Sequence, residues 1–331
     1  MNNERVSPVG LVLGSHMPPE LIMATARLAE ASGFGELWFS EDCFFSGGAA
    51  GVTAALAATE HLPVGLGIVS AVTRHPAIIA MEFAAISRMF PGRFRPGIGY
   101  GVPAWLDQMG LAQTSPLRAL RECVSALRRL LDGEELTETG EVFTFDQVVL
   151  THPPSERLPI DMGLVNEHGL RLSGEIADGT VLSVLASPAY VSWARERIRE
   201  GAARGARTDA HRVTTYTLFS VDSDGRKAKS AVRDAVAFYL AAMPDTALGN
   251  VYGIGDEVRD LLRRGGVDEV TRGMPSHWVE DLAVAGEPDE CADKLKTLLA
   301  AGSDSIGLWL FPVDEGDRVA HLAATEVLPR L

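Results

Sequence analysis

Short apolar runs that alternate with helix-like segments constrain the fold of this chain more than any other feature of its sequence. Each run is rich in Val, Ile, Leu or Phe, and apolar residues recur at helical spacing after most of them. This alternation is typical of βα units, whose strands form a parallel sheet. The predicted strands cover residues 9–13, 36–40, 64–69, 94–98, 160–164, 180–184, 213–221 and 305–310.

Eight predicted strands favour an α/β fold of the closed (β/α)8 TIM-barrel type. A doubly wound open sheet commonly has about five or six strands, whereas the barrel needs eight, each followed by a helix. The helical segment at residues 317–327 would complete the outer ring of helices. A chain of 331 residues fits one such barrel, and we expect a single domain over residues 1–331.

Two segments interrupt the alternation. Residues 138–152 carry strand propensity around a turn-like centre, which predicts an inserted hairpin. Residues 243–286 mix short helical pieces with several glycines and match no βα unit. An insertion after a barrel strand commonly covers the mouth where substrates bind, and an extra surface layer or a subunit contact is the alternative.

The charge balance argues against polyanionic partners. The chain has 30 Lys and Arg against 44 Asp and Glu, a formal net charge of −14, which opposes docking on nucleic acid or on an anionic membrane surface. No apolar run approaches the roughly 20 residues that span a bilayer. Cys43, Cys123 and Cys291 lie far apart and form neither a disulfide framework nor a zinc motif. We therefore expect a cytoplasmic protein that acts on a small molecule.

Candidate acids and bases lie where strands end, because the active site of a TIM barrel is built at the carboxyl ends of its strands. His16 follows the first strand, and Glu41 and Asp42 follow the second. Adjacent carboxylates on a strand point to opposite sides, so Glu41 and Asp42 cannot form a glycosidase-type pair. No HExxH, GxSxG or Walker motif is present. We therefore expect no metal site. So few acid and base candidates suit chemistry that is performed by a bound organic cofactor.

Two glycine-containing segments are candidates for holding that cofactor. Gly97, Gly99 and Gly101 alternate at the end of the fourth strand without the spacing of a dinucleotide fingerprint. Bare backbone there would let a flat ring approach, and close strand–helix packing is the alternative. The N–H groups of Gly163-Leu164-Val165-Asn166, between a strand and a helix, could hold a phosphate. The alternative is that Asn166 is an ordinary helix N-cap.

Five segments, in order along the chain, carry a resemblance to a known superfamily. They are GFGELWFSED at 33–42, TRHPA at 73–77, PGRF at 91–94 with GIG at 97–99, LRLSGEIADG at 170–179 and GEPDEC at 286–291. Together they resemble the bacterial-luciferase-like superfamily of flavin- and deazaflavin-dependent barrel enzymes. Within it, the chain is most similar to the methylenetetrahydromethanopterin reductase group, which uses the deazaflavin coenzyme F420.

The resemblance implies an oxidoreductase that transfers a hydride between reduced F420 and a C=C or C=N bond of a small organic substrate, or the reverse. Glu41, Asp42 and His16 are then the candidates for moving the proton. One alternative is an FMN-dependent monooxygenase that uses reduced flavin and O2. A barrel that binds a flavin-like ligand without turnover is a third possibility. We also expect a homodimer.

The resemblance further implies where the cofactor lies. Members of the deazaflavin group have a non-prolyl cis peptide at a bulge in the third strand, which backs the ring, and counting back from Arg74-His75-Pro76 places it at Gly67–Ile68. Asp42 and Gly99 would border the ring. The loop from Gly163 to Asn166, with Leu164 and Val165, would bind the cofactor phosphate.

Two departures from the family pattern bear on the substrate. F420-dependent sugar-phosphate dehydrogenases have a histidine where this chain has Asp42, and a glutamate and an asparagine where it has Val102 and Trp105. We therefore do not expect sugar-phosphate oxidation. Phe44, Tyr100 and Trp105 instead predict an apolar or aromatic substrate pocket.

Overall fold

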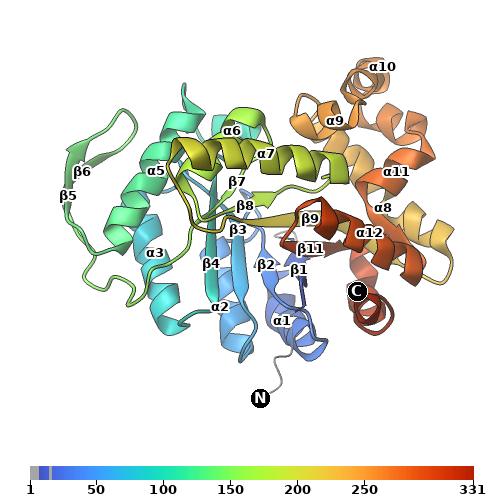
Figure 1. Ribbon diagram of the computed structural model, residues 1–331, viewed down its shortest axis with the longest axis horizontal. Coiled ribbons are helices and arrows are strands. Elements are labelled where there is room, and N and C mark those ends of the chain that lie inside the picture. The colour runs from blue at the N-terminus through green and yellow to red at the C-terminus, as the bar shows by residue number, and fades with distance from the viewer. Residues whose placement is uncertain (1–6, 15–16) are drawn as a thin grey trace.

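Eight parallel strands close into a barrel in the computed structural model, which describes residues 7–14 and 17–331. In spatial order they follow the chain, and the last pairs with the first (Figure 1). The TIM-barrel prediction is confirmed. The barrel strands are β1 (Val9–Leu13), β2 (Leu37–Phe39), β3 (Val64–Ser70), β4 (Phe94–Gly99), β7 (Asp161–Gly163), β8 (Gly179–Leu182), β9 (Arg212–Val221) and β11 (Ser305–Leu310).

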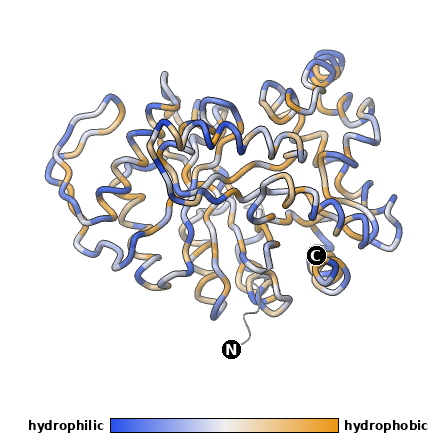
Figure 2. Tube along the Cα trace, in the orientation of Figure 1, coloured by the Kyte–Doolittle hydropathy of each residue, from blue (hydrophilic) through white to orange (hydrophobic). Residues whose placement is uncertain are grey.

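Helices surround the strands because the apolar side of each helix is buried against the barrel. On α5, for example, Leu120, Val124 and Leu127 are fully buried while the intervening residues are largely polar. Figure 2 shows apolar residues gathered on the central strands and alternating with hydrophilic ones along the outer helices. The helices around the barrel are α1 (Ile22–Ala31), α2 (Gly48–Ala58), α3 (Pro76–Met89), α4 (Pro103–Gln108), α5 (Pro116–Leu131), α6 (Glu167–Ile176), α7 (Pro188–Arg204), α12 (Pro288–Ala301) and α13 (Gly316–Leu322).

Short helical turns complete the ring. They are η1 (Pro19–Leu21), η2 (Val313–Glu315), η3 (Ala323–Val327) and η4 (Leu328–Arg330). The segment predicted as one helix at 317–327 is therefore α13 continued by the π-helical turn η3. Within the described residues, no helix is both long enough and apolar enough to cross a bilayer.

The predicted hairpin is present as β5 (Leu136–Thr139) and β6 (Thr144–Val148), which pair antiparallel. It stands at one end of the long axis of the molecule (Figure 1). The ring of His75, at the start of α3, lies 5.8 Å from the Phe143 ring and 4.9 Å from the Phe145 ring. His75 therefore fastens the hairpin to the barrel.

Residues 243–286 form a helical layer at the opposite end of the long axis (Figure 1). They pack on α8 (Gly225–Ala242), and the shared core includes Val236 of α8 and Trp278 of the layer. A short strand that the pattern did not predict, β10, pairs with the end of β9. The elements of the layer are α9 (Ala247–Tyr252), α10 (Gly255–Gly273), α11 (Ser276–Leu282) and β10 (Val284–Gly286).

Glycines line much of the barrel interior, and two aromatic side chains fill the space they leave. A Cβ on Gly65 would lie 2.3 Å from the Trp38 ring, and a Cβ on Gly67 would lie 2.1 Å from the Tyr216 hydroxyl. The Trp38 and Tyr216 rings, from β2 and β9, meet at 5.9 Å edge to face. Because the backbone at these glycines has no side chain, the barrel closes around two large residues without overpacking.

Candidate active site

The predicted site residues share one mouth of the barrel. Glu41 and Asp42 follow β2, Ile68 lies in β3, and Asn166 follows β7. Strands β2, β3, β4 and β7 are successive parallel neighbours, so their carboxyl ends meet at the same rim. His16, the third candidate acid, lies outside the described residues.

Glu41 is held in a structural ion pair. Its carboxylate accepts two hydrogen bonds from the Arg74 guanidinium, at 2.8 and 2.7 Å, and a third from the Gly48 N–H at 2.6 Å. Only 11% of the Glu41 side chain is exposed. These contacts connect the loop after β2 to the start of α2 and to the loop after β3. The Glu41 side chain therefore holds the three segments in position.

The Gly67–Ile68 peptide is cis, as the resemblance implies, and the β3–β4 register shifts between Leu66 and Val69. The Ile68 side chain occupies the space left by two neighbouring glycines. A Cβ on Gly99 would lie 2.3 Å from Ile68 Cδ1, and a Cβ on Gly163 would lie 2.7 Å from Ile68 Cγ2. The Ile68 side chain therefore packs against the bare backbone at Gly99 and Gly163. Ile68 itself is half-buried.

The loop from Gly163 to Asn166 is fixed from both sides. The Val165 carbonyl accepts a 2.7 Å hydrogen bond from the Tyr190 hydroxyl. Asn166 stands at the N-cap position of α6, but its side chain makes no cap bond and instead accepts a 2.8 Å hydrogen bond from the Ala247 N–H. The interpretation of Asn166 as an ordinary side-chain cap is therefore wrong, because the insertion takes that oxygen.

Residues from the insertion side also reach the mouth. The Tyr239 ring of α8 lies 6.1 Å from the Trp309 ring at the end of β11. Burial, together with the nearby negative charge of Asp42, raises the pKa of the Tyr239 hydroxyl. With the Asn166–Ala247 bond, these contacts place α8 and the start of α9 beside the mouth. Nothing in the sequence pattern marks Tyr239, because it lies inside an amphipathic helix.

Aromatic side chains from the loop after β2 and from α4 contact each other. The Phe45 and Trp105 rings contact edge to face, with centroids 6.3 Å apart, and Phe44, which precedes Phe45 in the chain, is 66% exposed. The Tyr100 hydroxyl accepts a 2.7 Å hydrogen bond from the Gln113 N–H, so it orders the loop after α4. Phe45, rather than Phe44, thus makes the contact with Trp105.

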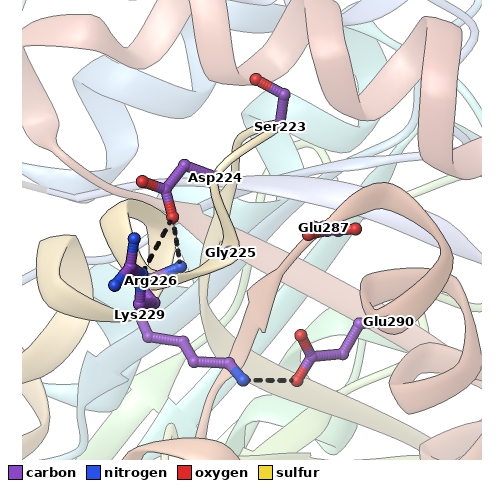
Figure 3. Close-up of a pocket in the computed structure, with 7 residues that line it drawn as sticks. All are labelled: Ser223, Asp224, Gly225, Arg226, Lys229, Glu287 and Glu290. Atoms are coloured by element: carbon purple, nitrogen blue, oxygen red, sulfur yellow. Dashed lines mark hydrogen bonds and ion pairs between the residues drawn. The ribbon is translucent and has the colours of Figure 1, made fainter.

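A charged hollow of about 430 Å³ lies apart from these residues, between the loop after β9 and the start of α12 (Figure 3). Lys229 Nζ lies 3.0 Å from Glu290 Oε1. Asp224 caps α8 by accepting a 3.0 Å hydrogen bond from the Arg226 N–H. These charged groups already pair with one another, so we assign no cofactor to this hollow. No group of three metal-ligating side chains occurs among the residues that the structure describes.

Two relatives and one solved structure are similar to this chain over most of its length. The chain is 29% identical over 287 residues to the 5,10-methylenetetrahydromethanopterin reductase of Methanolobus tindarius, covering 85% of this chain and 87% of that protein. It is 28% identical to the F420-dependent glucose-6-phosphate dehydrogenase of Nakamurella multipartita, covering 83% and 79%. The solved coenzyme F420 dependent tetrahydromethanopterin reductase from Methanopyrus kandleri superposes with a TM-score of 0.86 at 26% identity, covering 98% and 99%.

A family model covers most of the chain. The model described as luciferase-like monooxygenase matches residues 6–305, which contain the first seven barrel strands and end at the first residue of β11. The chain therefore belongs to the luciferase-like monooxygenase family.

Proposed function

We propose that this protein is an F420-dependent oxidoreductase that transfers a hydride between reduced F420 and a C=C or C=N bond of a small organic substrate, or the reverse. The observation that carries the proposal is the floor of the mouth, where Ile68 sits on Gly99 and Gly163 next to a helix N-terminus without a side-chain cap. When bound, the deazaflavin supplies or accepts the hydride. One relative and one solved structure that are named for this cofactor match the chain over most of its length.

The residues present fit a flat ring that carries a phosphate. Gly67, Ile68 and Gly99 offer an apolar floor without projecting polar groups. An anion at the N-terminus of α6 would be favoured by the helix dipole and could accept hydrogen bonds from the N–H groups of Leu164, Val165 and the first turn of the helix. Because Asn166 binds Ala247 instead, its side chain does not compete for those N–H groups.

Titration with each cofactor tests the proposal. Purified protein should bind F420 much more tightly than FMN, as measured by fluorescence or absorbance, and a reduced, bound F420 should be reoxidised by an enoyl or imine acceptor. Tighter FMN binding with oxygen consumption would support the monooxygenase alternative instead. Binding of F420 without reoxidation by any acceptor would support a barrel that only binds its ligand.

We propose that Asp42 donates or accepts the proton that accompanies hydride transfer, and that Glu41 is a positioning residue. The Glu41 carboxylate is fully engaged by Arg74 and Gly48. We expect Glu41→Gln to cost about 2 kcal/mol of unfolding free energy, because a charged hydrogen-bond pair is lost. Its kcat should fall less than about tenfold, whereas Asp42→Asn should lose about a hundredfold or more, as is typical for a general acid.

The pH profile of kcat/KM separates the two roles. Glu41→Gln should keep both limbs of the profile, and Asp42→Asn should lose one of them. The assignment is wrong if the limb disappears with Glu41→Gln and persists with Asp42→Asn.

We propose a substrate with an apolar or aromatic body. Phe45 contacts Trp105, and Phe44, Phe45 and Val102 expose 66, 58 and 43% of their surface, so the segments after β2 and β4 offer apolar surface to a substrate. An acceptor that carries an alkyl or aryl group should therefore show a lower KM than a polar acceptor with the same reactive bond.

We also propose a cytoplasmic homodimer. The three cysteines are free thiols, which suits a reducing compartment.

Helix α3 exposes Ile78, Met81 and Met89 by 44, 53 and 56%, and their spacing places them along one stripe of the helix. A second copy packed stripe to stripe would bury these side chains.

Met81→Glu should therefore convert the dimer to a monomer, because it places a charge in the middle of the buried stripe. Light scattering after size-exclusion chromatography measures the mass. The control is Val267→Glu on α10, where the valine is 43% exposed and outside the stripe; this variant should stay dimeric. A monomeric wild-type protein contradicts the proposal.

A further inference from the structure

Three buried polar atoms inside the barrel have no hydrogen-bond partner among the residues that the structure describes. They are Glu36 Oε1, Trp38 Nε1 and the Tyr216 hydroxyl. The residues are 5%, 0% and 6% exposed. A buried polar group without a partner costs about 1–3 kcal/mol. Three such atoms in one barrel interior therefore require an explanation.

The chemistry of the three atoms is complementary. The Trp38 N–H only donates, the Glu36 oxygen only accepts, and the Tyr216 hydroxyl can do both. The second Glu36 oxygen is already used, since it accepts a 2.6 Å hydrogen bond from Arg212. Buried waters in proteins commonly join such groups with about three hydrogen bonds each. Together these groups can therefore donate to and accept from a buried water molecule.

The Tyr216 hydroxyl lies directly against the floor of the mouth. The missing Cβ of Gly67 would stand 2.1 Å from this oxygen, and that of Gly307 would stand 2.9 Å from Tyr216 Cδ1. Both glycines are needed to admit the ring. The hydroxyl thus contacts Gly67 from inside the barrel. The next residue, Ile68, forms the proposed contact with the cofactor ring.

We propose that ordered water occupies the barrel axis, bound by the Tyr216 hydroxyl and the Trp38 N–H, and that Tyr216 is a positioning residue for the Gly67–Ile68 floor. The link to the cofactor ring rests on the proposed function. The water site itself does not, because it depends only on the residues inside the barrel. Neither Tyr216 nor Trp38 would touch the substrate.

A high-resolution crystal structure of the cofactor-free protein tests the water site. We expect a water oxygen about 2.7–3.2 Å from the Tyr216 hydroxyl and its loss or displacement in Tyr216→Phe. A dry interior in the wild-type protein overturns the proposal, and this result is independent of whether the variant folds.

Titration with F420 tests the positioning role. Tyr216→Phe should raise the Kd for F420 about three- to tenfold, the effect of losing the hydrogen bond between the Tyr216 hydroxyl and the proposed water, and should shift the spectrum of the bound cofactor. The matched control is Tyr252→Phe, which removes a hydroxyl that donates to Asp281 outside the barrel and should leave both the Kd and the spectrum unchanged. An unaltered Kd and spectrum in Tyr216→Phe overturn the role. Failure of the wild-type protein to bind F420 would instead refute the proposed function and leave the water site to the crystal structure.

Discussion

Gly99→Ala is expected to weaken F420 binding by about 5- to 150-fold while the barrel stays folded. The new Cβ would lie 2.3 Å from Ile68 Cδ1, so the Ile68 side chain must move. Because Ile68 is half-buried and faces the mouth, it would move into the space proposed for the cofactor ring. Overpacking of this kind costs about 1–3 kcal/mol, which corresponds to about a 5- to 150-fold change in affinity.

A second substitution should restore binding. Ile68→Ala in the Gly99→Ala background frees the space, so the double variant should bind F420 more tightly than Gly99→Ala alone. Gly316→Ala is the control, because a Cβ there meets nothing within 4 Å. Fluorescence titration gives the affinities, and thermal unfolding shows whether the barrel persists. If Gly99→Ala binds F420 like the wild-type protein, Ile68 does not form the floor.

Asp178→Ala is expected to cost about 3–5 kcal/mol of unfolding free energy, the range for breaking a buried ion pair. Asp178 accepts hydrogen bonds from Arg128, Arg157 and Arg207, at 2.8, 2.6 and 2.8 Å. The Ile160 N–H donates a fourth, at 2.8 Å. Removal of the carboxylate leaves three guanidinium groups close together without their shared partner. Urea unfolding of both proteins measures the difference.

The same residue gives the protein an acid-sensitive contribution to stability. Burial alone would raise the pKa of Asp178, but the Ile160 N–H, Arg157 and Arg128 hold it well below its usual value. A carboxylate with a lowered folded-state pKa stabilises the fold above its unfolded value of about 3.9, and this contribution is lost as the pH falls toward the folded value. The gap between wild type and Asp178→Ala should therefore narrow below about pH 4.

A surface pair provides the comparison. Asp256 contacts Arg259 at 2.6 Å, but its side chain is 97% exposed, and such pairs contribute about 0–1 kcal/mol. Asp256→Ala should therefore cost much less than Asp178→Ala. Equal losses in the two variants would show that the arginine cluster does not stabilise the protein.

The sequence alone predicts the barrel because each strand is a short apolar run in a regular series. β1 and β11 lie at 9–13 and 305–310, as the pattern indicates, and the other barrel strands shift by only one or two residues at their ends. β10 and α4 were not predicted, because Val284–Gly286 and Pro103–Gln108 are too short to show a period. Periodicity carries information on elements that are long enough to repeat it.

The site is predicted less completely, because its contacts join residues far apart in the chain. The resemblance places the cis peptide at Gly67–Ile68, but only the structure shows that Ile68 fills the space at Gly99 and Gly163. Likewise, the ion pair that engages Glu41 comes from Arg74 on another loop. The positions of candidate acids follow from strand ends, whereas their roles depend on partners that no local pattern reveals.

The glycines inside the barrel also limit how this sequence can diverge. Trp38 needs Gly65, and Tyr216 needs both Gly67 and Gly307, so each large residue is coupled to small ones on other strands. A mutation at one member of such a set produces either a cavity or a clash until a second mutation compensates it. Substitutions along the barrel axis should therefore be inherited in pairs, and libraries that vary these positions one at a time should recover few folded members.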